Sequence, residues 1–138
     1  MLLRRTLSAL LLATLFLAAP TLSAEPQYSD IFLMTNDYQV GVANQLLIII
    51  KLDDGFKYNS EYPSKVRVYE RPTKIRTYGI FEKDHFLEER DYVIALIPFV
   101  PLEAGTEKIK LRLSYSVCDS TRCLVESVRY EAEIEIYE

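Results

Sequence analysis

Residues that build metal centres and hydrolase sites are scarce in this sequence. Its 138 residues include two cysteines and one histidine, whereas structural zinc usually takes four protein ligands. A Ser/His/Asp triad would have to use His85, and no serine has the flanking glycines of a nucleophile elbow. Glu88 and Glu89 are adjacent, so on a strand they would face opposite sides. We therefore expect no metal site, no cofactor and no hydrolytic centre.

Long apolar runs are also missing, except at the beginning of the chain. Arg4 and Arg5 precede an apolar run from Leu7 to Ala19, and Leu22-Ser23-Ala24 places a small residue before a cleavage point. This pattern predicts a secretory signal peptide over residues 1–24, with the mature chain beginning at Glu25. The run is too short to cross a bilayer, and an uncleaved membrane anchor is the less favoured alternative. We expect a periplasmic or secreted protein without stable membrane insertion.

Residues 25–138 are expected to form one domain. These 114 residues are enough for a single core, and they contain no repeat or low-complexity segment. The signal holds two of the 16 basic residues and none of the 20 acidic residues, which gives the mature chain a net charge of −6. Acidic and basic residues alternate along the chain, whereas nucleic acid favours clustered Lys and Arg. No nucleic-acid partner is expected.

The hydrophobic pattern of the mature chain has mostly a period of two, which is typical of strands with one buried face. Turn signals such as Asp53-Asp54-Gly55 and Pro101 to Gly105 separate several of these segments. Many short strands joined by turns predict an all-β antiparallel sandwich. The expected strands are Ile31–Thr35, Tyr38–Leu52, Phe56–Asn59, Lys65–Tyr69, Lys74–Tyr78, Tyr92–Phe99, Lys108–Val117 and Leu124–Tyr137.

The last two expected strands show the clearest alternation. If Cys118 lies opposite Cys123, an antiparallel pairing turns the apolar residues of both strands to one face. The pairs on that face are Ile109 with Ala132, Leu111 with Tyr130, and Leu113 with Val128. A shift by one residue would expose them all, so the pattern predicts this register.

The opposite face of the same hairpin is charged. It would carry two cross-strand ion pairs worth about 0.2–1 kcal/mol each, Lys110 with Glu131 and Lys108 with Glu133. The same register sets Arg112 against Arg129, an unfavourable contact that a bulge near the loop could relieve.

The two cysteines are expected to form a disulfide at the hairpin tip. Directly opposed residues have Cα atoms about 4.5–5.5 Å apart, within the range that a disulfide bridges, and export favours oxidation. The ring spans only six residues, for which the chain-entropy model gives about 2 kcal/mol. This small gain favours a bond that exchanges with another protein. On residue type alone, a passive structural disulfide is an equal alternative.

The loop between the cysteines is polar, and we expect it to be exposed, as exchange requires. Arg122 adjoins Cys123 and would lower the pKa of its thiol, whereas Asp119 adjoins Cys118 and would raise the pKa of that thiol. Cys123 is therefore the candidate for the sulfur that joins a partner, with Arg122 on the partner surface.

Two segments carry a pattern of residues beyond their hydrophobicity. Leu113 to Cys118 is Leu-Ser-Tyr-Ser-Val-Cys, followed after four residues by Cys123-Leu124, and Leu52 to Asn59 contains a Gly-aromatic pair followed by another aromatic. Together they resemble the N-terminal domain family of the thiol:disulfide interchange protein DsbD, with its Tyr-Gln-x-Cys and Cys-x-Pro stretch. The resemblance extends from about Gln45 onward. Departures are Ser116 in place of the family's Gln, and Leu124-Val125-Glu126 where prolines are usual.

This resemblance implies a periplasmic, immunoglobulin-like sandwich in which Cys118 and Cys123 are the redox pair. In the family, the disulfide accepts electrons from a membrane-embedded relay and passes them to thioredoxin-like partners outside the cytoplasm. The transmembrane segments and the thioredoxin-like domain of that reductase have no counterpart in this sequence. The electrons are therefore expected to come from a separate protein.

The family also shields its cysteines with a cap loop that bears an aromatic residue. By position, the matching segment is Lys83 to Leu87, with Phe86 as the lid. We expect His85, in the same segment, to be a surface residue or a helper near the cap rather than a catalyst. Tyr58 falls where a family aromatic lies near the cysteines.

Two hypotheses of function follow. The first is a thiol-disulfide exchange module, a component of a protein-disulfide reductase system, that relays electrons between thioredoxin-like exported proteins and a membrane electron carrier. The second is a non-catalytic, immunoglobulin-like binding or assembly module whose disulfide is purely structural.

Overall fold

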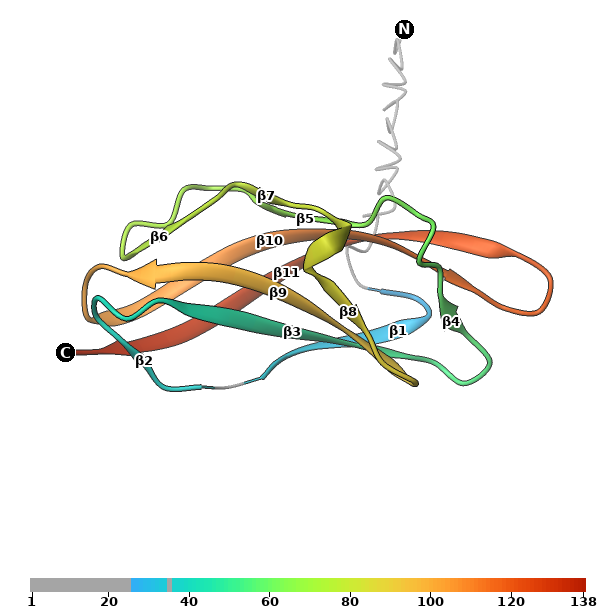
Figure 1. The fold of residues 1–138 in the computed structure, drawn as a ribbon, viewed down its shortest axis with the longest axis horizontal. Helices are drawn as coiled ribbons and strands as arrows, with labels where there is room; N and C mark the ends of the chain where they lie inside the picture. Colours follow the sequence, from blue (N-terminus) through green and yellow to red (C-terminus); the bar gives the residue numbers. More distant parts are fainter. Residues whose placement is uncertain (1–25, 35) are drawn as a thin grey trace, which may run out of the picture.

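The computed structural model describes residues 26–34 and 36–138 of the chain. The expected signal peptide, residues 1–24, lies outside the described residues. The described residues form two β-sheets that pack face to face around one apolar core (Figure 1). This confirms the predicted all-β sandwich. No helix in this part of the chain has the length and apolar character needed to cross a membrane.

Sheet 1 has the strand order β1-β3-β9-β6. The short strand β8 also pairs with β9, at a different part of that strand from β6. Its strands are β1 (Ser29–Met34), β3 (Asn44–Leu52), β6 (Ile75–Thr77), β8 (Phe86–Glu88) and β9 (Tyr92–Pro101). All of its pairings are antiparallel. A short 3-10 helix, η1 (Lys83–His85), leads into β8.

Sheet 2 has the order β2-β11-β10-β5-β7, and β4 pairs with the far end of β10. Its strands are β2 (Tyr38–Gln39), β4 (Lys57–Tyr58), β5 (Lys65–Val68), β7 (Ile80–Phe81), β10 (Gly105–Cys118) and β11 (Cys123–Tyr137). Among the strands of this sheet that the structure describes, only β2 and β11 pair in parallel, over a short stretch. The long β10–β11 hairpin runs the length of the sandwich, and its tip lies at the end opposite the C-terminus (Figure 1).

The core is made by alternate residues of the long strands, as the period of two predicts. Burial removes their apolar area from water at about 25 cal/mol per Å², which is the main force holding the two sheets together. The hydrophobic side chains with at most 1% exposure on β3, β9 and β10 are Leu46, Ile48, Ile50, Val93, Ala95, Ile97, Ile109, Leu111, Leu113, Tyr115 and Val117.

The predicted register of the final hairpin is confirmed. Cys118 lies opposite Cys123, and the three apolar pairs and both Lys/Glu pairs stand as expected. The suggested bulge is wrong, because the ladder runs without interruption from Gly105 to Cys118 and sets Arg112 directly against Arg129. The guanidinium group of Arg129 lies over the Tyr69 ring instead, 6.0 Å from its centroid.

The single strand predicted over Tyr38–Leu52 is also wrong, because the chain changes sheets within it. β2 ends at Gln39 and pairs with sheet 2, whereas β3 begins at Asn44 and pairs with sheet 1. The turn between them uses Gly41, whose φ of +79° suits glycine. Alternation can indicate a strand, but it does not indicate which sheet the strand joins.

A buried carboxylate ties the first described residues to the long hairpin. Glu126 lies on β11 opposite Tyr115 and is 6% exposed. Its Oε1 atom accepts hydrogen bonds from the backbone N–H groups of Gln27 and Tyr28, both at 2.7 Å. Its Oε2 atom accepts one from the Ser29 hydroxyl, also at 2.7 Å.

The tyrosine opposite this carboxylate completes the network. Because Ser29 gives its only hydroxyl proton to Glu126, Tyr115 must donate in the 2.6 Å hydrogen bond between the two hydroxyl groups. Burial raises the pKa of Tyr115 well above its ordinary value, so its phenol keeps the proton that this bond needs. The network therefore satisfies polar groups that the core would otherwise leave unpaired.

We expect Glu126→Ala to lower the free energy of unfolding by about 2–3 kcal/mol, because charge-assisted hydrogen bonds are lost and their donors lose a partner. Urea unfolding measures the change. The matched control is Glu133→Ala, which removes an exposed carboxylate from the same strand and should change stability by less than about 0.5 kcal/mol. Equal losses in the two variants would show that the buried network contributes nothing special.

Candidate functional site

The candidate site is the tip of the β10–β11 hairpin, where the predicted disulfide is confirmed. Cys118 ends β10, Cys123 begins β11, and their sulfur atoms are bonded at 2.01 Å. Their Cα atoms are 4.0 Å apart, somewhat closer than predicted. Asp119 and Arg122 form the next pair toward the loop, and the Asp119 N–H donates a hydrogen bond to the Arg122 carbonyl. Hydrogen-bonded and non-hydrogen-bonded pairs alternate along an antiparallel ladder, so Cys118 and Cys123 form a non-hydrogen-bonded pair, the type with the shorter Cα–Cα distance.

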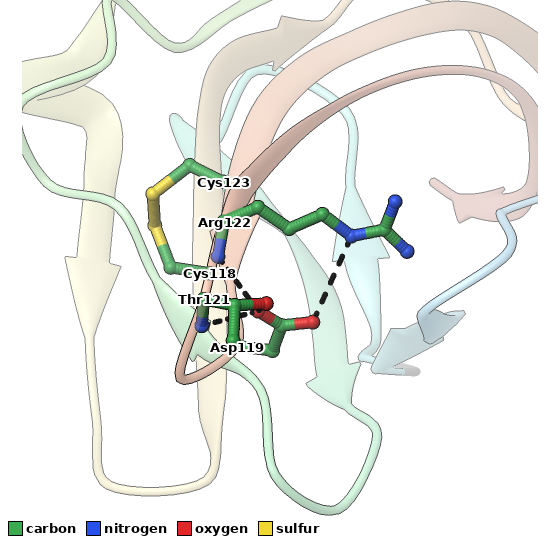
Figure 2. A network of polar contacts seen from close by, with 5 residues as sticks. All are labelled: Cys118, Asp119, Thr121, Arg122 and Cys123. Atoms are coloured by element: carbon green, nitrogen blue, oxygen red, sulfur yellow. Dashed lines mark hydrogen bonds and ion pairs between the residues drawn. A yellow bond between two sulfur atoms is a disulfide. The ribbon is translucent and has the colours of Figure 1, made fainter.

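The loop is shaped by the side chain of Asp119. Its Oδ1 atom accepts hydrogen bonds from the Thr121 and Arg122 backbone N–H groups, both at 2.8 Å, and from the Thr121 hydroxyl at 3.0 Å (Figure 2). These bonds favour the charged carboxylate and lower its pKa below the ordinary value. Such a side-chain turn is the usual role of aspartate at the start of a tight loop.

The disulfide faces away from the core. The preceding pair on the ladder is Val117 with Leu124, and both side chains face inward. Because successive residues alternate, the cysteine side chains project from the outer face of sheet 2. Cys123 is exposed and Cys118 is half-buried. Of the two sulfur-bearing residues, Cys123 is therefore the more accessible to another protein.

Arg122 does not point toward the sulfur atoms. Its Nε atom lies 3.8 Å from Asp119 Oδ2, and Figure 2 shows its guanidinium group on the opposite side of the loop from the disulfide. The arginine thus has a carboxylate partner of its own. The choice of Cys123 as the joining sulfur consequently rests on its exposure rather than on Arg122.

Lys57 is a site residue that the sequence did not single out. The two-residue strand β4 pairs with the end of β10 and sets Lys57 opposite Cys118. Paired residues share a face, and their Cβ atoms are about 4.5–5.5 Å apart. The outer face therefore carries the row Lys57, Cys118, Cys123. The expected strand Phe56–Asn59 indicated β4, but its partner strand could not be inferred from a two-residue pairing.

The residues proposed for the cap lie on neighbouring elements. Phe86 begins β8, lies opposite Ala95 of sheet 1 and stacks on the Tyr58 ring at a centroid distance of 6.4 Å. Tyr58 lies opposite Val117 and donates a hydrogen bond of 2.8 Å to Ser64. Burial raises the pKa of the Tyr58 phenol. The structure therefore brings Phe86 and Tyr58 together at the edge of the core, on the inner face with Val117, whereas the cysteines lie on the outer face.

His85 takes a different position. It ends η1, and its ring packs edge-on against Phe81 at 5.0 Å, while Nε2 lies 4.0 Å from Asp84 Oδ2. These contacts belong to the β7–η1 connection rather than to the hairpin tip.

Other chemistry has little support in the described part of the chain. Residues 26–34 and 36–138 contain no cluster of three or more His, Cys, Asp or Glu side chains arranged to hold a metal ion. One surface hollow is lined by residues 62–65 and 82–84, and neither cysteine contributes to it.

Comparison of the chain with protein-family models and with curated proteins finds no match. The DsbD resemblance therefore rests on the quoted residues alone, and the function is argued from the geometry of the site.

We expect the Cys118→Ser/Cys123→Ser double variant to stay folded and to lose about 2 kcal/mol of stability or less. The ring is small, and the neighbouring ladder already holds the two strands together. Urea unfolding of the oxidised wild type and the variant measures the difference. A loss of more than about 4 kcal/mol would mark the disulfide as a structural requirement.

Proposed function

We propose that this protein is an exported thiol-disulfide exchange module that relays electrons between protein partners through Cys118 and Cys123. The observation that carries the proposal is a disulfide on the outer face of sheet 2, with Cys123 exposed, at the end of a ladder that already pairs the two strands along their length. A bond that contributes little to stability and is open to approach is suited to exchange. The compartment is the periplasm or the exterior, as the signal pattern predicts.

The geometry supports a definite order of bond changes. A partner thiolate attacks the Cys123 sulfur, and the Cys118–Cys123 bond breaks as a mixed disulfide forms. The electron pair leaves on Cys118 as a thiolate. The second cysteine of the same partner, as a thiolate, then attacks the partner sulfur of the mixed disulfide, and Cys123 is released as a thiolate. The partner becomes oxidised, the domain gains two electrons, and the reverse sequence passes them onward.

The row of three residues suits this order. Cys123 is the exposed end where attack occurs, and Cys118 is the leaving sulfur. A leaving thiol departs faster when its pKa is low, and a neighbouring ammonium group stabilises its thiolate. Lys57 lies opposite Cys118 on the same face, which supports this role for its ammonium group. We therefore assign Lys57 as a positioning residue that acts through the cysteine.

The partners suited to this chemistry are thioredoxin-like exported proteins, which carry paired cysteines, and a separate membrane electron carrier as the source of electrons. The competing function is a binding or assembly module with a structural disulfide. Reduction potential separates the two, because structural bonds lie below about −300 mV and exchange bonds lie higher.

We expect reduced Cys118→Ser to form a stable mixed disulfide with a thioredoxin-like exported protein whose second active-site cysteine is replaced by serine and whose remaining thiol is activated with thionitrobenzoate. Cys123 attacks that sulfur and displaces thionitrobenzoate, and neither protein keeps a second thiol that could resolve the adduct. Non-reducing electrophoresis and mass spectrometry detect the adduct. The control is Cys123→Ser, whose remaining half-buried thiol should give several-fold less. If neither variant forms an adduct and the wild-type potential lies below about −300 mV, exchange is excluded and the structural function stands.

We expect Lys57→Met to raise the pKa of the Cys118 thiol, measured in a Cys123→Ser background by thiolate absorbance against pH. Loss of a neighbouring positive charge destabilises the thiolate. Lys65→Met is the matched control, because Lys65 lies on the same face opposite Ser114 of the same strand, away from the cysteines. Equal pKa values in all three proteins would remove Lys57 from the site.

A further inference from the structure

Three arginines lie in register across the outer face of sheet 2. Arg67 on β5 lies opposite Arg112 on β10, which lies opposite Arg129 on β11. Neighbouring strands are about 4.8 Å apart, so the three arginine side chains project from the same face as a compact row. All three residues are exposed. None of them takes part in an ion pair among the described residues.

The basic residues next to this row, in contrast, have carboxylate partners. Lys110 lies 2.8 Å from a Glu70 carboxylate, and Lys108 lies within 4.0 Å of carboxylates on β11. Like charges directly opposite each other destabilise a sheet. Within residues 26–34 and 36–138, the neighbouring lysines thus have carboxylate partners, whereas the three facing arginines have none, and Arg129 contacts only the Tyr69 ring. Such an uncompensated row is typical of a surface selected for a partner rather than for stability.

An open strip connects the arginine row with the disulfide. The outer-face residues of β11 between them, Val125 and Ser127, are exposed, as are Cys123 and Arg129 at the two ends. Six residues of strand span about 20 Å. The neighbouring strand β10 offers no such open strip between Cys118 and Arg112. Its outer-face residue Ser116 is 1% exposed and accepts a hydrogen bond from the Asn59 side chain. A protein that reaches Cys123 along β11 would therefore cover the arginine row as well.

We propose that the row formed by Arg67, Arg112 and Arg129 binds an acidic patch of the exchange partner and so aligns its thiol with Cys123. The proposal rests on the proposed function and adds the chemistry of the partner. Carboxylates suit the row because the planar guanidinium group binds them through two parallel hydrogen bonds.

A flat anionic membrane is a poorer fit to the same row. The outward-facing residues of β11 directly beyond it are acidic, namely Glu131, Glu133 and Glu135. Their carboxylates would repel an extended negative surface, whereas a partner with a localised acidic patch can contact the arginines alone.

The test measures binding of a fluorescent, thiol-free oligoglutamate peptide to the purified exported protein by anisotropy. We expect about tenfold tighter binding than for an oligoglutamine peptide, with the preference lost at high salt. Arg112→Gln/Arg129→Gln should abolish the preference. The control, Lys51→Gln/Arg76→Gln, removes the same charge from exposed positions on sheet 1 and should retain it.

The outcomes separate docking from exchange. No preference for oligoglutamate, or equal loss in both double variants, overturns the acidic docking site. Arginine-dependent binding to phosphatidylglycerol vesicles that exceeds binding to the peptide overturns it in favour of a membrane. A cysteine-bearing oligoglutamate peptide that binds the row but forms no adduct supports the docking site and excludes exchange. Adducts that form equally fast with glutamate and glutamine peptides support exchange and overturn the docking site.

Discussion

The antiparallel ladder between β10 and β11 determines the positions of the disulfide, of the buried Glu126 network and of two of the three facing arginines. Paired residues share a face and successive residues alternate, so one register places every side chain of the hairpin at once. It buries Leu113 against Val128, sets Glu126 inside opposite Tyr115 and brings Cys118 to Cys123 on the outside. The burial of apolar side chains on the inner face fixes this register. The outer-face residues are held in place by interactions they do not themselves make.

This division explains why the outer face can carry unfavourable or weak contacts. The facing pair Arg112 and Arg129 opposes pairing, and the small disulfide ring adds little to it. Both are tolerated because the inner face and the Glu126 network supply the stability. Residues that do not hold the fold together are free to serve recognition and chemistry, which is where the proposed function and the proposed acidic contact are located.

The sequence predicted the features that depend on local alternation. It indicated the sandwich, the final hairpin with its register and the disulfide, because each follows from the period of two along neighbouring strands. It did not predict the sheet change at Gly41, since alternation continues on both sides of that turn. The regular ladder at Arg112 was missed because a local repulsion is outweighed by the pairing on either side.

The candidate site was predictable to a similar extent. The cysteines were found from their spacing, whereas Lys57 and the arginine row come from strands that are distant in the sequence and adjacent in the sheet. Charges that alternate along the chain can still collect in a row across strands. Glu126 was likewise unexpected at an inner position, because its donors lie almost a hundred residues away, near the beginning of the described chain.

The narrow cysteine pair at the end of the ladder has a further consequence. When the sulfur–sulfur bond opens, the flanking strands remain paired and the Asp119 turn keeps its own hydrogen bonds. Little reorganisation is needed, so the oxidised and reduced forms present nearly the same outline to a visiting molecule. Under the proposed function, discrimination between the two forms would depend on the sulfur atoms themselves, and release of the partner would follow from the chemistry and not from a change of shape.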